Sequence, residues 1–169
     1  MNVREALERQ YRASLEMLER AVVQCPDSLW AAGTPNKFWH IAYHALFYVH
    51  FYLQKSDKDF MPWTGHRPDS QYLGPRPWAP EAPPKAVAPY SKDEVLEFQR
   101  FCRAELAARL PQLDMDAPSG FGWLPFSTLE VQLYSLRHLA HHTGQLIERL
   151  RSQGSIGVSW VIGRERPGE

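Results

Sequence analysis

The sequence predicts an all-α protein, a four-helix bundle whose second and third helices are joined by a long proline-rich crossover. Three observations favour this class. Apolar residues recur at three- and four-residue spacing in four stretches, capping residues precede most of them, and one segment between them holds eight prolines. A chain of 169 residues is the size of one domain with its own core. We expect a single domain over residues 1–169, with helices at about 2–25, 35–54, 91–110 and 128–153.

The first helix has a start signal and one apolar face. Asn2 and Glu5 have the spacing of a capping box, in which each side chain accepts a bond from a free backbone N–H. Pro26 marks the end of the helix, because proline cannot continue the hydrogen-bond pattern. The apolar face consists of Leu7, Tyr11, Leu15, Leu18 and Val22.

The second helix is expected to begin at Thr34 and Pro35, a capping hydroxyl followed by a proline in the first turn. It is apolar almost all round as far as Gln54, which indicates that most of its surface is buried. The segment 61–89 that follows carries the eight prolines and cannot continue a helix. Two interpretations stay open for it: a connection pinned to the helices by its aromatic residues, or a lid over a pocket.

The third and fourth helices each begin with a capping box. Ser91 with Glu94 marks the first, and Ser127 with Glu130 marks the second. Gly154 is expected to supply the C-terminal cap of the fourth helix, because glycine tolerates the left-handed backbone found there.

Charge and composition exclude several classes of function. Nineteen basic and nineteen acidic residues cancel, so no basic footprint for nucleic acid is visible. The most apolar stretch, 38–53, is too short and too polar to cross a membrane. The N-terminus shows no secretory leader. Cys25 and Cys102 lie far apart and outside any Cys-x-x-Cys pair, so we expect no disulfide framework and a cytoplasmic location.

Five of the seven histidines fall in two short windows of the predicted second and fourth helices. His138 and His142 are four residues apart, which places both rings on one helical face where they can converge on one ion. The alternative is an ordinary solvated face. His40 and His44 lie in the helix that must be buried, where an imidazole needs either a hydrogen-bond partner or a metal.

The runs Phe-Trp-His-Ile-Ala-Tyr-His-Ala-Leu-Phe at 38–47 and His-Leu-Ala-His-His-Thr-Gly-Gln at 138–145 resemble the DinB-like superfamily of four-helix-bundle proteins. The resemblance implies a metal ion held by one histidine of the second helix and the His-x-x-x-His pair of the fourth. The ligands would be His44, His138 and His142, with His40 as the rival of His44. Gln145 would orient a ligand or a bound water from outside the coordination shell.

Three imidazoles suit zinc, nickel or iron and leave a coordination position open, as in catalytic sites. The resemblance implies a metal-dependent enzyme acting on a small molecule, either a thiol S-transferase that uses a low-molecular-weight thiol or a hydrolase. Candidate proton carriers are Tyr48, Tyr134 and His141, with His40 as a further possibility. The alternative function is a non-catalytic, stress-related bundle in which the metal is structural.

A homodimer is also expected. The predicted fourth helix carries an aliphatic face opposite its histidines, so it needs two partners, and relatives in the superfamily are frequently dimers.

Overall fold

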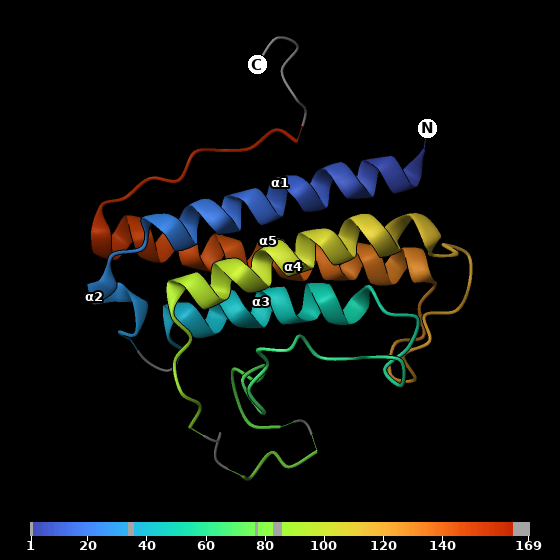
Figure 1. The fold of residues 1–169 in the computed structure, drawn as a ribbon, viewed down its shortest axis with the longest axis horizontal. Helices are drawn as coiled ribbons and strands as arrows, with labels where there is room; N and C mark the ends of the chain where they lie inside the picture. Colours follow the sequence, from blue (N-terminus) through green and yellow to red (C-terminus); the bar gives the residue numbers. More distant parts are fainter. Residues whose placement is uncertain (1, 34–35, 77, 83–85, 164–169) are drawn as a thin grey trace.

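Four long helices lie side by side, with the segment that joins the second of them to the third along one flank and residues 155–163 along the opposite flank (Figure 1). The computed structural model describes residues 2–33, 36–76, 78–82 and 86–163. Its helices are α1 (Val3–Gln24), α2 (Asp27–Trp30), α3 (Phe38–Tyr52), α4 (Lys92–Arg109) and α5 (Thr128–Gly154), with a 3-10 turn η1 (Leu110–Gln112). The described residues form no strand, only two isolated bridges, so the all-α prediction is confirmed.

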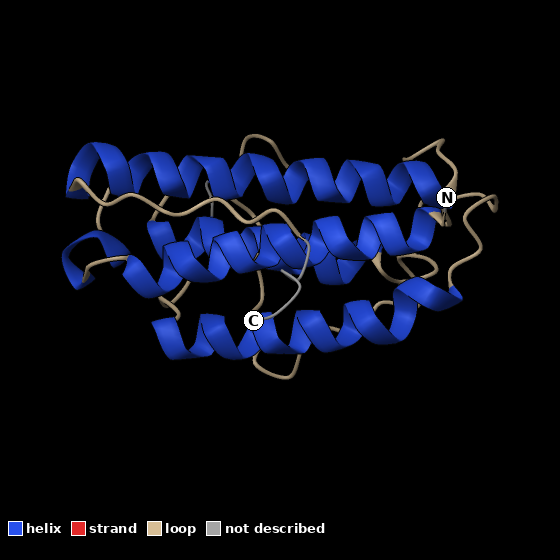
Figure 2. Cartoon of the chain, turned by 90° about the horizontal axis from the view of Figure 1, so that it is seen from above, coloured by secondary structure: helices blue, strands red, loops and turns tan. Residues whose placement is uncertain are grey.

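Helices α3 and α1 both pack against α4 and α5, and all four lie lengthwise along one another (Figure 2). Their buried apolar side chains form the core. Eleven of the 15 residues of α3 are buried, as expected for a helix without a polar face. Helix α5 buries Leu139, Leu146 and Leu150 in the same core. The aliphatic face that predicted a dimer is therefore partly covered within the chain, since Leu136 and Ile147 pack against the core but remain half-buried. The homodimer stays a prediction. None of the described helices meets the length and hydropathy that a membrane crossing requires.

The first two helix boundaries differ in detail from the expectation. Asn2 does cap α1 by accepting a bond from the Arg4 N–H at 3.1 Å. Glu5 bonds to the side-chain amide of Asn2 and not to its backbone, so the reciprocal capping box is absent. Residues 36 and 37 are not helical, so α3 begins at Phe38 rather than at 35. The expected cap at Thr34 and Pro35 lies outside the described residues.

The two later capping boxes are confirmed. The hydroxyl oxygens of Ser91 and Ser127 accept hydrogen bonds from the backbone N–H groups of Glu94 and Glu130 at 3.1 and 3.3 Å. In return, each glutamate carboxylate accepts a hydrogen bond from the backbone N–H of its serine.

The C-terminal cap of α5 was predicted wrongly. Gly154 is the last helical residue, and Ser155 adopts the left-handed conformation at φ 52°. Its N–H donates to the carbonyl of Arg151 at 3.2 Å. A β-carbon at Gly154 would lie 3.2 Å from Ile156 Cδ1, so this glycine serves close packing and not chain reversal.

The proline-rich arm, residues 61–89, is anchored to the helices close to both of its ends. Trp63 is buried and stacks on Phe98 of α4 with ring centroids 4.9 Å apart. Tyr90, next to the arm, stacks on Tyr43 of α3 at 4.3 Å. Trp78, in contrast, is 68% exposed. The interpretation as a pinned connection therefore fits Trp63, while the arm's role as a lid stays untested.

Candidate metal centre

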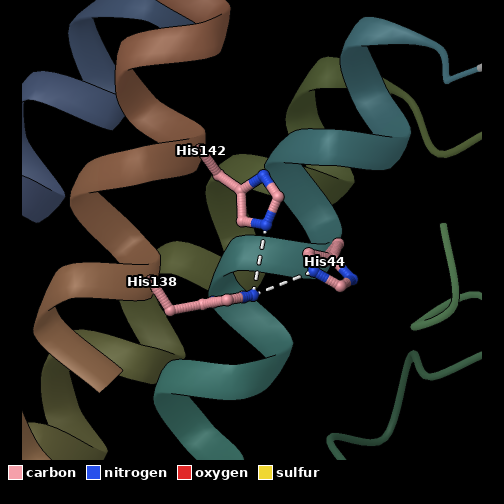
Figure 3. Close-up of side chains that lie close together, drawn as sticks. All are labelled: His44, His138 and His142. Carbon is pink, nitrogen blue, oxygen red and sulfur yellow. Dashed lines mark hydrogen bonds between the residues drawn. The ribbon is translucent and has the colours of Figure 1, made fainter. Parts of the chain in front are cut away.

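Three histidine side chains from two helices meet at one point (Figure 3). His44 comes from α3, and His138 and His142 come from successive turns of α5. The Nε2 atom of His138 lies 3.0 Å from His44 Nε2 and 3.1 Å from His142 Nε2. One nitrogen from each ring lies within 4.8 Å of the other two, so the group could hold a metal ion.

The outer hydrogen bonds of two of these rings fix their tautomers. His44 Nδ1 lies 2.6 Å from the main-chain oxygen of Gln71, which can only accept, so the proton sits on Nδ1. His142 Nδ1 lies 2.7 Å from Gln145 Oε1 and is assigned a proton in the same way. A neutral ring protonated at Nδ1 has a bare lone pair at Nε2. The lone pairs of His44 and His142 are therefore both directed at His138.

Burial keeps these rings neutral. Desolvation is the largest cause in each case, and it lowers the pKa of His44 to about 3 and that of His138 to about 4. Neighbouring imidazoles lower both further, and burial also lowers the pKa of His142. At neutral pH the three rings are thus uncharged, which is the form that binds a metal.

The nitrogen positions fit a metal better than a hydrogen-bond network. His138 can place one proton at Nε2 and donate it to one of its two neighbours, which leaves the Nε2 lone pair of the other neighbour without a donor about 3 Å from the same nitrogen. Imidazole nitrogens about 2.0–2.1 Å from a shared ion are separated by about 2.8–3.4 Å in octahedral or tetrahedral geometry. A cation between the three nitrogens would therefore be bound by lone pairs that a single proton on His138 cannot all satisfy. His138 Nδ1 has no hydrogen-bond partner within the described structure.

The rival ligand His40 lies outside this group. Its Nε2 is 3.0 Å from the carbonyl oxygen of Ser70 in the arm, and its ring stacks on Trp39. The sequence could not separate His40 from His44, because they share one helical face. In the structure the two differ in their partners, because His40 contacts the arm carbonyl of Ser70 whereas His44 also contacts His138 of α5.

The three candidate proton carriers lie at different distances from the site. The Tyr48 ring is 4.9 Å from the His44 ring and 5.2 Å from the His138 ring. His141 is exposed, and its ring lies 4.9 Å from that of His142. The Tyr134 ring packs against Tyr52 with ring centroids 5.5 Å apart, and among the described residues it makes no ring contact with the three histidines. This geometry favours Tyr48.

Sequence reasoning missed the main-chain carbonyls of Ser70 and Gln71, which hold His40 and His44. No residue type signals a carbonyl, since every residue carries one. The predicted partner Gln145 does lie beside His142, as its position one turn further along α5 implied.

The described residues define a class: an all-helical protein with a cluster of three partly or fully buried histidines that could hold a metal ion. The sequence model of the DinB superfamily matches residues 7–146, which include all three histidines. The chain therefore belongs to the DinB superfamily. The comparison with curated proteins and the comparison with solved structures gave no match.

The lowered histidine pKa values predict acid sensitivity of the metal-free protein. In the unfolded chain an imidazole has a pKa of about 6.5, well above the pKa values of His44 and His138 in the folded protein. As the pH falls below about 6.5, the unfolded chain takes up protons that the folded chain refuses, so the free energy of unfolding decreases until the folded pKa values are reached. Urea denaturation between pH 7.5 and about 4.5 measures this slope. We expect His44→Gln to reduce the slope by about one proton, and an unchanged slope would contradict the pKa assignment.

Proposed function

We propose that this protein is a metal-dependent enzyme of the DinB superfamily that acts on a small molecule, by thiol S-transfer or by hydrolysis. It would bind one divalent ion, zinc, nickel or iron, through His44, His138 and His142. The single observation that carries the proposal is the convergence of the three Nε2 atoms with two bare lone pairs directed at the third. The four long helices and their pairwise contacts support the finer prediction of a four-helix bundle with the arm in its crossover.

Three protein ligands leave at least one coordination position for water or a substrate atom. An ion held in this way supplies Lewis acidity, which lowers the pKa of a water or thiol toward neutrality and makes a nucleophile available. In S-transfer, the thiol sulfur forms a bond to an electrophilic carbon, the leaving group departs with its electron pair, and the thiol proton passes to solvent or to a basic group.

We propose Tyr48 as the proton donor at this site. Its ring contacts both His44 and His138. Burial raises the pKa of Tyr48 to about 12, so it remains protonated at neutral pH and acts as a donor rather than a base. A protonated phenol can donate to a leaving group or hold a substrate oxygen.

The second candidate function is structural. His44 lies on α3, whereas His138 and His142 lie on α5, so a shared ion would cross-link two helices that already pack together. In that case the protein would be a non-catalytic, stress-related module. We also retain two further expectations as proposals: a homodimer, and a cytoplasmic location, which is supported by the free, buried state of Cys25 and Cys102.

An activity comparison tests the enzymatic proposal. The protein loaded with zinc, nickel or iron is incubated with glutathione and chlorodinitrobenzene for S-transfer, and with p-nitrophenyl acetate for hydrolysis. We expect a rate above background that Tyr48→Phe lowers by about 100-fold, since a positioned proton donor contributes about that much. Tyr134→Phe is the matched control and should retain the rate, because the Tyr134 ring packs against Tyr52 rather than against the three histidines. Metal-loaded protein that is inactive in both assays, with a melting temperature raised by the metal, would support the structural function instead.

A further inference from the structure

One turn of the arm, residues 65–71, lies against α3 beside the three-histidine cluster, and we refer to it as the arm turn. The carbonyl oxygen of Ser70 lies 3.0 Å from His40 Nε2, and that of Gln71 lies 2.6 Å from His44 Nδ1. The ligand candidate His44 is therefore bonded on its outer side to a segment that belongs to no helix.

The bond to the arm turn decides which ring nitrogen of His44 can bind a metal. A proton held on Nδ1 by the Gln71 carbonyl leaves Nε2 bare. The other tautomer carries its proton on Nε2, the nitrogen that faces His138, and could not bind an ion there. A main-chain carbonyl is held only by the fold of its own segment, so the tautomer of His44 depends on the groups that hold the arm turn in place.

The hydroxyl of Tyr90 holds the arm turn at two points. Tyr90 is 1% exposed, and its hydroxyl accepts a hydrogen bond from the main-chain N–H of Arg67 at 2.7 Å and donates one to the carbonyl of Gly65 at 3.0 Å. The ring itself is fixed, because it stacks on Tyr43 with centroids 4.3 Å apart and the Trp30 indole donates to the Tyr90 carbonyl at 2.8 Å. Burial strengthens both hydroxyl bonds, since the local dielectric constant is low.

Arg67 connects this hydroxyl to the carbonyls that hold the histidines. The N–H and the hydroxyl of the buried Ser70 donate to the Arg67 carbonyl at 3.1 and 2.6 Å, which closes the turn just before the carbonyl that binds His44. The Arg67 guanidinium lies 4.0 Å from the centre of the Tyr90 ring and pairs with Glu94 of α4. A continuous set of contacts thus runs from the start of α4 through the arm turn to the metal centre.

We propose that Tyr90 is a positioning residue for the metal centre, which acts through the arm turn to hold His44 in the tautomer that binds the ion. The effect on metal affinity rests on the proposed function, whereas the control of the His44 tautomer does not. Coupling between two binding events is reciprocal, so a bound ion holds the arm turn against α3 by the same factor by which the arm turn raises metal affinity.

Tyr90→Phe tests the proposal, because it keeps the ring and removes only the hydroxyl. Tyr11→Phe is the matched control: the Tyr11 hydroxyl is also buried and donates to the Gln132 carbonyl at 2.9 Å, between α1 and α5. We expect Tyr90→Phe to weaken zinc binding by about tenfold, because loss of a group that supports a ligand costs about 10–100-fold. Tyr11→Phe should leave the affinity unchanged. Chelator competition measures both.

The tautomer of His44 separates positioning from a general loss of stability. It is measured on metal-free protein by ¹⁵N NMR of the ring nitrogens of the seven histidines, with His44→Gln to assign the signals. We expect the proton on Nδ1 in the wild type and in Tyr11→Phe, and a mixture of the two tautomers in Tyr90→Phe.

A second pair of variants tests the same contacts without removing a buried group. The side chains of Arg67 and Arg103 are 33% and 31% exposed, and each pairs with a glutamate. We expect Arg67→Met to weaken zinc binding by about threefold, since a half-exposed ion pair contributes little. Arg103→Met, which breaks a pair between α4 and α1, should leave the affinity unchanged.

The outcomes distinguish failure of the positioning role from failure of the metal site. Retention of the Nδ1 proton of His44 in Tyr90→Phe would overturn the proposal, and so would equal zinc affinities of Tyr90→Phe and Tyr11→Phe. Either result leaves the metal function intact if the wild type binds zinc. Wild-type protein that takes up no zinc removes the metal function, and the tautomer measured on metal-free protein then decides the role of Tyr90.

Discussion

Replacing His142 with alanine is expected to abolish metal binding. Wild-type protein should carry about one ion per chain by elemental analysis after incubation with zinc or nickel. His142→Ala and His44→Ala each remove one of three convergent nitrogens. Loss of a residue that only supports a ligand costs about 10–100-fold in metal affinity, so loss of a ligand itself should cost more than about 100-fold. Isothermal titration or chelator competition measures the change.

Two substitutions of neighbouring residues provide a comparison for the loss of metal affinity. His141→Ala removes an exposed imidazole beside His142 and should leave the affinity unchanged. Gln145→Ala removes the acceptor for His142 Nδ1 and should weaken binding by about tenfold. An ion retained in His142→Ala, or the absence of any ion in wild type after incubation, would show that the three histidines do not form a metal site.

The substitution Gly120→Ala is expected to have the largest effect on stability among the glycine variants. Gly120 adopts φ +74°, a left-handed conformation that costs a non-glycine residue about 1–2 kcal/mol. A β-carbon there would also overlap the main-chain carbonyl oxygen of Lys55, next to the end of α3. The main chain at Lys55 cannot move aside as easily as the end of a flexible side chain could. We therefore expect the free energy of unfolding to fall by about 3 kcal/mol or more. For a chain of this size that corresponds to about 10 °C in Tm.

Gly122→Ala is the matched control for this substitution. It lies in the same loop, has no positive φ, and a β-carbon there would meet no atom within 4 Å. Both variants restrict the unfolded chain equally, so their difference isolates the folded-state clash. Thermal denaturation followed by circular dichroism measures it. Equal melting temperatures for the two variants would show that the loop moves away from Lys55 at little cost.

Much of the helical layout followed from local sequence. The capping boxes at Ser91 and Ser127 were predictable because both partners lie within one turn of each other. The start of α3 was not, since Thr34 and Pro35 carry a start signal while the helix begins at Phe38. The left-handed cap at Ser155 was not predicted either. Glycine is the usual residue in that conformation, so the sequence favoured Gly154 as the cap, whereas in the structure Gly154 is helical and packs against Ile156.

The sequence by itself determined the helical class and the pairing of His138 with His142. Both depend on the 3.6-residue period of a single helix, which is a local property. Only the tertiary structure shows that His44, and not His40, lies beside this pair, because that depends on where α3 lies along α5 and where the arm places its carbonyls. Such contacts arise from side-chain packing between elements, which the spacing within each element does not encode.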